Sequence, residues 1–197
     1  MRSDKTLPQY IFDKNYTVCI PSKDDIICYT DGSRHLGTCH SGASVFNQTL
    51  HQQHVLPLGK DSTITQAEIY AILACVNSLR TEYDASIAIC SDSQAALKAL
   101  DTSKTTLKLL AETMTELKRL SWFDSVRLIW VPGHFNIPGN EIADKLDNEA
   151  ACKEFIGPEP RIGITMTTLR TEVRSWADNT HRKLWQSSDG CRQAKMF

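Results

Sequence analysis

The stretch of sequence that decides the fold is residues 25–33, Asp-Ile-Ile-Cys-Tyr-Thr-Asp-Gly-Ser, in a chain of 197 residues. Its first half is apolar and rich in β-branched side chains, which predicts a strand buried on both faces. Asp31 takes the predicted last position of this strand, and Gly32 allows a sharp exit of the chain. A carboxylate beside the core is costly unless a positive partner meets it. Two interpretations therefore stay open: Asp31 is a turn residue, since Asp-Gly favours hairpin turns, or it is a metal ligand.

The residues that follow predict a mixed α/β layout. Further strands are expected at 37–46, 50–58, 86–90 and 126–131, and helices at 63–80, 94–100, 105–120 and 141–155. The three early strands follow one another directly, whereas helices separate the later ones. The predicted fold class is therefore α/β, with a mixed five-stranded sheet of three early antiparallel and two later parallel strands, flanked by helices. In open sheets of this kind, ligands bind beyond the carboxyl ends of the strands.

The pattern changes at both ends of the chain. Residues 1–24 show no sustained hydrophobic period, and we interpret them as a leader or linker with a short extended piece at 16–20. A Gly-Pro-Glu-Pro run at 157–160 interrupts the α/β pattern, and residues 167–185 predict one more helix. The expected organisation is a leader at 1–24, one domain at 25–155 and a C-terminal extension with one helix at 156–197.

Charge limits the functions that the domain can perform unaided. The whole chain has a formal net charge of −1, but residues 25–155 hold 11 Lys and Arg against 16 Asp and Glu. An acidic domain is not an obvious nucleic-acid binder by charge alone. If this domain handles phosphates, cations must first neutralise some of its carboxylates.

Composition also indicates a cellular compartment. The sequence holds no apolar run of 18 residues, so no membrane span is predicted. The N-terminus lacks the apolar region of a secretion signal. The seven cysteines form no CxxC pair, and several lie inside apolar runs. This usage indicates a reducing, intracellular compartment, the cytoplasm or the nucleus.

Four acidic residues, Asp31, Glu68, Asp92 and Asp144, stand out from the rest. Each has an ordinary explanation. Asp31 can be a turn residue, Glu68 can form a capping box with Thr65, Asp92 can be a helix N-cap, and Asp144 can be attracted to the positive end of its helix. Together the four acids favour a cation-binding site, because two of them end neighbouring strands and Glu68 lies on an apolar row of its helix. Like charges that close cannot all stay ionised without cations. Mg²⁺ takes oxygen ligands and combines carboxylates with substrate phosphates.

The motifs that hold these residues resemble type-1 ribonuclease H. They are Tyr-Thr-Asp-Gly-Ser at 29–33, Gln-Ala-Glu-Ile-Tyr-Ala at 66–71, Ser-Asp-Ser-Gln at 91–94, Val-Pro-Gly-His at 131–134 and Gly-Asn-Glu-Ile-Ala-Asp at 139–144. The order Asp, Glu, Asp, His, Asp and the ten-residue step from His134 to Asp144 match the family's catalytic set. The resemblance covers about residues 25–155 and predicts a ribonuclease H-like fold.

Within that family, residues 132–144 look most like the ribonuclease H domain of non-LTR retrotransposon polyproteins. Trp176, Trp185 and residues 190–195 resemble the segment that follows the domain there. The resemblance implies a reverse transcriptase domain in the same polyprotein as partner. We expect the isolated domain to be a monomer.

The resemblance also implies an activity, the endonucleolytic hydrolysis of the RNA strand of RNA–DNA hybrids. Two Mg²⁺ ions, with Mn²⁺ as a substitute, would flank the scissile phosphate and leave 3′-hydroxyl and 5′-phosphate ends. Asp31 would hold both ions, Asp144 the ion that activates water, and Glu68 and Asp92 the ion at the leaving oxygen. His134 would assist proton movement or product release. The residues expected to bind substrate are Gly32, Ser33, Gln66, Ser93 and Asn140.

The chain departs from the family at two places. Many cellular members carry a basic, Trp-rich helix that grips the DNA strand, but residues 100–105 are too few to form it. Ile64 stands where an Asn commonly contacts the RNA backbone, and Gln66 would substitute for it. Because phosphate neutralisation dominates nucleic-acid affinity, we expect weak, salt-sensitive binding of hybrids by this domain alone.

Two other interpretations stay open. Exonucleases of the same superfamily carry Asp-x-Glu on the first strand, and transposases end their set with Glu, whereas this chain has Asp31-Gly32-Ser33 and Asp144. The other alternative is a catalytically weak or inactive hybrid-binding or tether module. Such modules usually lose carboxylates, and here all four are present.

Overall fold

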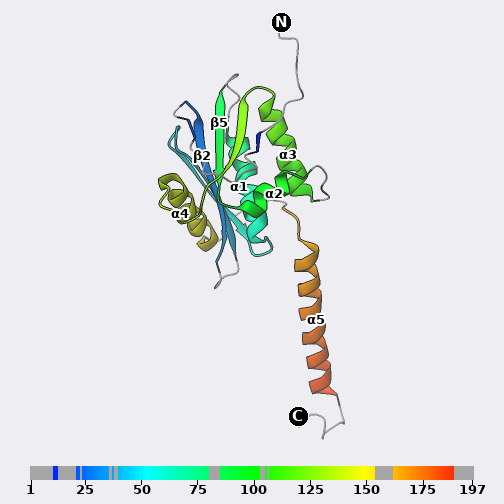
Figure 1. Cartoon of the computed structure of the whole chain (residues 1–197). Helices are drawn as coiled ribbons and strands as arrows, with labels where there is room; N and C mark the ends of the chain where they lie inside the picture. Colours follow the sequence, from blue (N-terminus) through cyan, green and yellow to red (C-terminus); the bar gives the residue numbers. More distant parts are fainter. Residues whose placement is uncertain are drawn as a thin grey trace. The chain divides into compact units, whose positions relative to one another are not determined.

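The computed structural model describes residues 11–12, 21–22, 24–35, 37, 40–79, 85–102, 105, 107–153 and 162–188. The chain divides into two compact units, residues 1–163 and 164–197. The first unit contains a sheet with the strand order β1-β6-β5-β2-β3-β4 (Figure 1). Its strands are β1 (Ile11–Phe12), β2 (Ile26–Arg34), β3 (Ser41–Asn47), β4 (Gln52–Gly59), β5 (Ser86–Ser91) and β6 (Ser125–Trp130). The extended piece expected at 16–20 lies outside the described residues.

The directions of the five expected strands are confirmed. Strands β2, β3 and β4 pair as an antiparallel meander, whereas β5 runs parallel to both β2 and β6. The sequence did not predict β1, which pairs in parallel with the outer edge of β6. Its two residues are too few to show an alternating pattern. The stretch interpreted as a leader therefore contributes a short strand to the sheet.

Strand β2 is longer than predicted. It continues to Arg34, with Asp31 opposite Ser44 and Gly32 opposite Ala43 of β3. The predictions that Asp31 ends the strand and that Gly32 makes a turn are therefore wrong. Pairing with β3 overrides the local turn preference of Asp-Gly, because the context of a sheet outweighs intrinsic propensity.

The helices lie within a few residues of their predicted positions. They are α1 (Ile64–Ser78), α2 (Gln94–Leu100), α3 (Lys108–Ser121), α4 (Pro138–Cys152) and α5 (Met166–Ser187). Helices α1, α2 and α3 lie on one side of the sheet and α4 on the other (Figure 1). The site described below lies where α1 and α4 both approach β2.

Helix α1 begins with a capping box that leaves Glu68 free. The Thr63 hydroxyl accepts a hydrogen bond from the Gln66 backbone N–H at 3.2 Å, and the Gln66 side-chain oxygen accepts one from the Thr63 N–H at 3.0 Å. Both partners satisfy donors that a helix start otherwise leaves unpaired. The capping box with Thr65, offered above as the ordinary explanation of Glu68, is therefore wrong.

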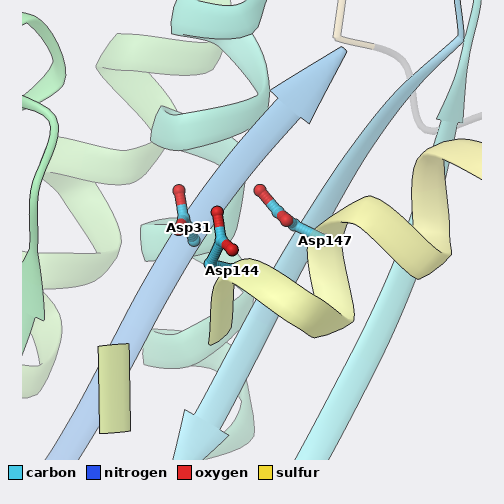
Figure 2. A group of neighbouring side chains, drawn as sticks. All are labelled: Asp31, Asp144 and Asp147. Atoms are coloured by element: carbon cyan, nitrogen blue, oxygen red, sulfur yellow. The ribbon is translucent and has the colours of Figure 1, made fainter. Parts of the chain in front are cut away.

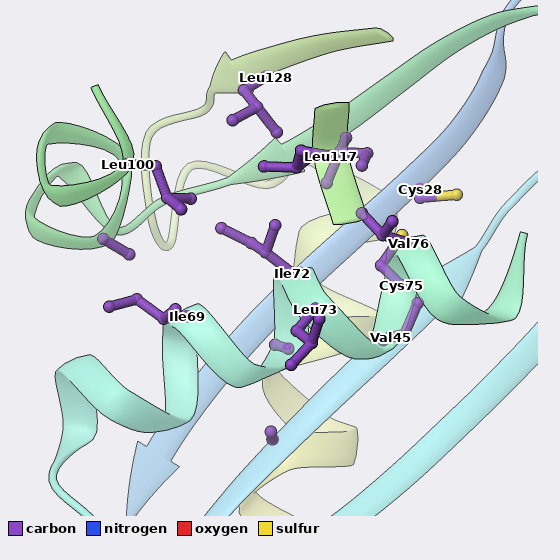
Figure 3. Packing of buried hydrophobic residues seen from close by; sticks show 14 of the residues in the cluster. Cys28, Val45, Ile69, Ile72, Leu73, Cys75, Val76, Leu100, Leu117 and Leu128 are labelled. Carbon is purple, nitrogen blue, oxygen red and sulfur yellow. The ribbon is translucent and has the colours of Figure 1, made fainter. Parts of the chain in front are cut away.

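The larger core holds α1 against the sheet. Ile72 and Val76 of α1 pack in one cluster with Leu117 of α3 and Leu128 of β6, and all four are fully or almost fully buried (Figure 3). Burial of a side chain of this size stabilises the fold by about 1.5–3 kcal/mol. A smaller cluster on the other face includes Tyr29, Phe46, Cys90 and Ala143 of α4. The cysteines expected to behave as small hydrophobes, Cys28, Cys75 and Cys90, are buried and take part in no disulfide bond.

Asp25 is a buried acid whose carboxylate is stabilised by an ion pair and hydrogen bonds. It forms an ion pair with Arg127 of β6 and accepts hydrogen bonds from the Ser86 hydroxyl at 2.5 Å and the Ser22 N–H at 2.6 Å. Burial raises the pKa of Asp25, but the hydrogen bonds from Ser86, Arg127 and Ser22, together with the charge of Arg127, outweigh burial and lower the pKa overall. Asp25 therefore links the beginnings of β2, β5 and β6.

The second unit contains α5, which confirms the helix expected at 167–185. The Thr165 hydroxyl caps it by accepting a hydrogen bond from the Thr168 N–H at 3.1 Å, and none of the described residues of α5 is buried. Among all described residues, no helix has both the length and the apolar character that crossing a membrane requires.

Candidate active site

The sequence-predicted acids come from four different elements. Asp31 lies within β2, Glu68 in the second turn of α1, Asp92 directly after β5, and Asp144 in α4. Strands β2 and β5 are parallel neighbours, with Thr30 opposite Ser91. The residues that follow this pair, Asp31 and Asp92, therefore stand at the same level of the sheet.

A first cluster joins Asp31, Glu68 and Asp92. One carboxylate oxygen from each lies within 4.8 Å of the others. Asp31 and Glu68 are each only 6% exposed, and Glu68 Oε2 has no hydrogen-bond partner among the described residues. The structure thus brings together the three acids that the sequence placed near two strand ends and on an apolar helix row.

A second cluster joins Asp31, Asp144 and Asp147, again with carboxylate oxygens within 4.8 Å of one another. Figure 2 shows the three side chains between β2 and the facing side of α4. Sequence reasoning missed Asp147. Its spacing from Asp144 was a usable signal, because residues three apart share one face of a helix.

Four of these acids, Asp31, Glu68, Asp92 and Asp147, have pKa values above the usual range of a carboxyl group. Burial first, and then the charge of Asp92, raise the pKa of Asp31 to about 7. Burial and the charge of Asp31 raise the pKa of Glu68 to about 10 and that of Asp147 to about 8. Burial also raises the pKa of Asp92. The site therefore gathers more carboxylates than it can ionise without added positive charge.

Hydrogen bonds orient two of these acids. The Gly32 N–H donates to Asp31 Oδ1 at 2.8 Å, and the Asn140 side-chain amide donates to Asp92 Oδ2 at 3.4 Å. Gly133 also packs on Asp92, because a Cβ atom there would lie 2.6 Å from Asp92 Oδ2. The loop after β6 and the start of α4 thus fix the position of Asp92.

His134 lies on that loop and is exposed. Its backbone has φ 52°, in the left-handed region that non-glycine residues seldom adopt. A positive charge on His134 lowers the pKa of both Asp31 and Asp92. The imidazole is therefore close enough to act electrostatically on the carboxylates.

Several residues expected to bind substrate also have structural contacts within the chain. Gln66 forms the capping box of α1 and donates to the Gly163 carbonyl at 2.8 Å. Ser93 caps α2 by accepting from the Ala96 N–H at 3.3 Å, and Asn140 is buried against Asp92. Gly32 is buried below α1, whereas Ser33 is half-buried, two positions beyond Asp31.

The donor set fits a hard divalent cation. Every candidate ligand is a carboxylate oxygen, which suits Mg²⁺ or Mn²⁺. The buried oxygens Glu68 Oε2 and Asp147 Oδ1 lack hydrogen-bond partners among the described residues, as expected of ligand atoms whose partner is an ion.

A mixed α/β sheet that buries such a set of carboxylates is typical of metal-dependent enzymes of phosphoryl transfer. Comparison with known proteins gives the family: residues 23–152 match the RNase H family. The chain is also similar to Ribonuclease H of Polynucleobacter asymbioticus (strain DSM 18221 / CIP 109841 / QLW-P1DMWA-1). The two are 29% identical over 149 residues, which covers 68% of this chain and 94% of the relative. The chain belongs to the RNase H family and is a ribonuclease H, with the α/β fold expected from its sequence.

Proposed function

We propose that this chain cleaves the RNA strand of RNA–DNA hybrids internally, with two divalent cations at the Asp31 clusters. The observation that carries the proposal is that Asp31 belongs to both three-carboxylate groups. One carboxylate shared by two clusters is the arrangement that two neighbouring cations require. Mg²⁺ is the proposed ion, with Mn²⁺ as a substitute.

The residues divide into two sides around Asp31. Asp144 would hold one cation with Asp31, and Glu68 and Asp92 would hold the other. When bound, the two ions supply a water-derived nucleophile at neutral pH and stabilise charge on the leaving 3′-oxygen. The products would be a 3′-hydroxyl and a 5′-phosphate.

The remaining residues position the substrate and these acids. His134, exposed beside the acids, would move a proton or help the product leave. Asn140 would keep Asp92 oriented through its side-chain amide. Ser93 is half-buried close to Asp92, where its polar groups would contact the nucleic-acid backbone, whereas the Ser33 hydroxyl oxygen is buried. Recognition would rest on A-like helix shape and 2′-hydroxyl groups rather than on bases.

We further propose that the domain works as part of a retrotransposon reverse-transcription protein. The support is the resemblance of residues 132–144 to such polyproteins. A reverse transcriptase joined to it would hold the hybrid, which a domain with 11 basic and 16 acidic residues between 25 and 155 binds poorly by itself.

The test is cleavage of end-labelled RNA in an RNA–DNA hybrid, with Mg²⁺ and with chelator. The intact chain should cut the RNA strand only with Mg²⁺, and Asp31→Asn should lose the activity by at least about 10³-fold, since an essential charge at the reacting centre is removed. Glu149→Gln, an equal change of charge on the exposed side of α4, is the matched control and should cut normally. Equal inertness of the intact chain and Asp31→Asn would favour the tether interpretation. Equal cutting of single-stranded RNA would rule out hybrid specificity.

A further inference from the structure

Asp147 is the acid of this site that the sequence motifs do not include. It lies in α4, is only 1% exposed, and its Oδ1 has no hydrogen-bond partner among the described residues. One of its carboxylate oxygens lies within 4.8 Å of those of Asp31 and Asp144 (Figure 2). The side chain is therefore buried and directed at two other acids.

Close packing keeps Asp147 in this position. Helix α4 meets β3 at Gly42, where a Cβ atom would lie 2.5 Å from the Ala151 backbone nitrogen and 2.7 Å from the Ala150 Cβ. The Ser44 hydroxyl also donates to the Ala143 carbonyl at 2.7 Å, which ties the same helix to β3. These contacts hold the part of α4 that carries Asp147 close to β3 and to the other acids.

Asp147 also differs from the other buried acid of the fold. Asp25 is met by Arg127, Ser86 and Ser22, which offset the cost of its burial. At Asp147, by contrast, the neighbouring charged groups are the carboxylates of Asp31, Asp144 and Glu68, and the Asn148 backbone and the Ser33 hydroxyl offset burial and these charges only in part. A buried carboxylate that faces other carboxylates destabilises a fold unless something binds there.

We infer that Asp147 is a third carboxylate ligand of the divalent cation held between Asp31 and Asp144. The inference rests on the proposed function, which assigns that cation to Asp31 and Asp144. The carboxylate oxygens of the three acids lie within 4.8 Å of one another, so side-chain adjustment alone could bring them to one Mg²⁺, which takes oxygen ligands at about 2.1 Å.

A third carboxylate changes what this side of the site can bind. Three negative groups around one dication favour a hard cation more strongly than two, and they bind it at lower free concentration. The cation on the α4 side should thus remain bound when no nucleic acid is present to supply phosphate oxygens.

The experiment measures Mn²⁺ binding to the full chain without nucleic acid, from the electron paramagnetic resonance signal of free Mn²⁺. Asp147→Asn keeps the shape of the side chain and removes the ligand charge, and Asp147→Ser is made alongside it as a smaller variant that α4 can accommodate. We expect the tightest Mn²⁺ site to weaken at least about tenfold in both, the range in which loss of a metal-supporting group usually falls. Glu149→Gln, with the same change of charge on the same helix, should change the affinity less than twofold.

Thermal unfolding in chelator distinguishes a metal-binding role of Asp147 from a purely structural role. Asp147→Asn should raise the melting temperature of the metal-free chain, because it removes an acid whose burial beside Asp31 and Asp144 costs stability. Mn²⁺ should then stabilise the variant less than the intact chain. Unchanged Mn²⁺ affinity in folded Asp147 variants, with binding lost in Asp31→Asn, would overturn the inference and leave the proposed function standing. Mn²⁺ binding that survives Asp31→Asn would instead remove the proposed metal site and this inference with it.

Discussion

The backbone of Gly32 in β2 packs directly on the backbone of Glu68 in α1. A Cβ atom on Gly32 would lie 2.9 Å from the Glu68 Cα and 2.6 Å from the Ala67 carbonyl carbon. Real Cβ atoms essentially never come this close to backbone atoms. The glycine therefore sets the distance between strand and helix, and through it the distance between the Asp31 and Glu68 carboxylates.

We predict that Gly32→Ala destabilises the fold and lowers cleavage together. The new methyl group must push α1 away from β2, at a cost of about 1–3 kcal/mol for overpacking. Urea unfolding measures the first effect, and the rate of hybrid cleavage under folded conditions measures the second. Gly37→Ala is the control, since among the described residues its Cβ would meet the His35 side chain at 3.1 Å, and it should stay within about 0.5 kcal/mol of the intact chain. Normal cleavage by folded Gly32→Ala would show that the approach of β2 and α1 does not set the active geometry.

Much of this architecture could be predicted from local patterns. Alternating and apolar runs placed five strands and five helices, and the motifs brought Asp31, Glu68, Asp92 and Asp144 to one site. What the sequence could not show depends on contacts between distant elements. Gly32 resembled a turn glycine because its packing against α1 exists only in the folded chain. Asp147 was not singled out, because its burial depends on the close approach of α4 to β3 at Gly42, which is not visible in a linear pattern.

We predict that the metal-free chain becomes less stable as pH rises from about 5 to 8. Burial and neighbouring acids raise the pKa of Asp31 to about 7, of Asp147 to about 8 and of Glu68 to about 10. In the unfolded chain these groups ionise near pH 4. The folded state thus binds more protons over this interval, and each such group lowers the free energy of unfolding by about 1.4 kcal/mol per pH unit until its folded pKa is passed.

The measurement is the melting temperature in chelator across that range, repeated with Mg²⁺. Mg²⁺ should raise the melting temperature more at pH 8 than at pH 5, because it binds the deprotonated carboxylates. Glu68→Gln should flatten the loss of stability in chelator. A melting temperature that holds steady or climbs between pH 5 and 8 without metal would contradict the raised pKa values.

We predict that Asn140→Ala lowers kcat/KM about tenfold and moves the acid limb of the pH profile upward. Asn140 donates a hydrogen bond to Asp92 Oδ2 at 3.4 Å, and this contact lowers a pKa that burial raises. Without it, Asp92 holds its proton to higher pH and is less firmly oriented, and loss of such a supporting group typically costs about 10–100-fold. Cleavage rates between pH 6 and 9 measure both effects. A uniform fall in rate with an unmoved acid limb would mean that Asn140 acts through the fold and not through Asp92.

We predict that this chain alone binds RNA–DNA hybrid weakly, with a Kd of about 1 μM or more at physiological salt. Residues 25–155 carry 11 basic against 16 acidic side chains, so two bound dications would bring the domain near neutrality without making it basic. Helix α2 ends at Leu100 and α3 begins at Lys108, and the residues described between them add no helix that could grip the DNA strand. Phosphate contacts supply most nucleic-acid affinity, and their number sets the slope of log K against log salt concentration. Fluorescence anisotropy with a hybrid of non-hydrolysable RNA backbone, in Mg²⁺ and at several salt concentrations, should show Kd rising with salt. A nanomolar Kd at physiological salt would contradict the prediction, because it would require a basic surface that residues 25–155 do not supply.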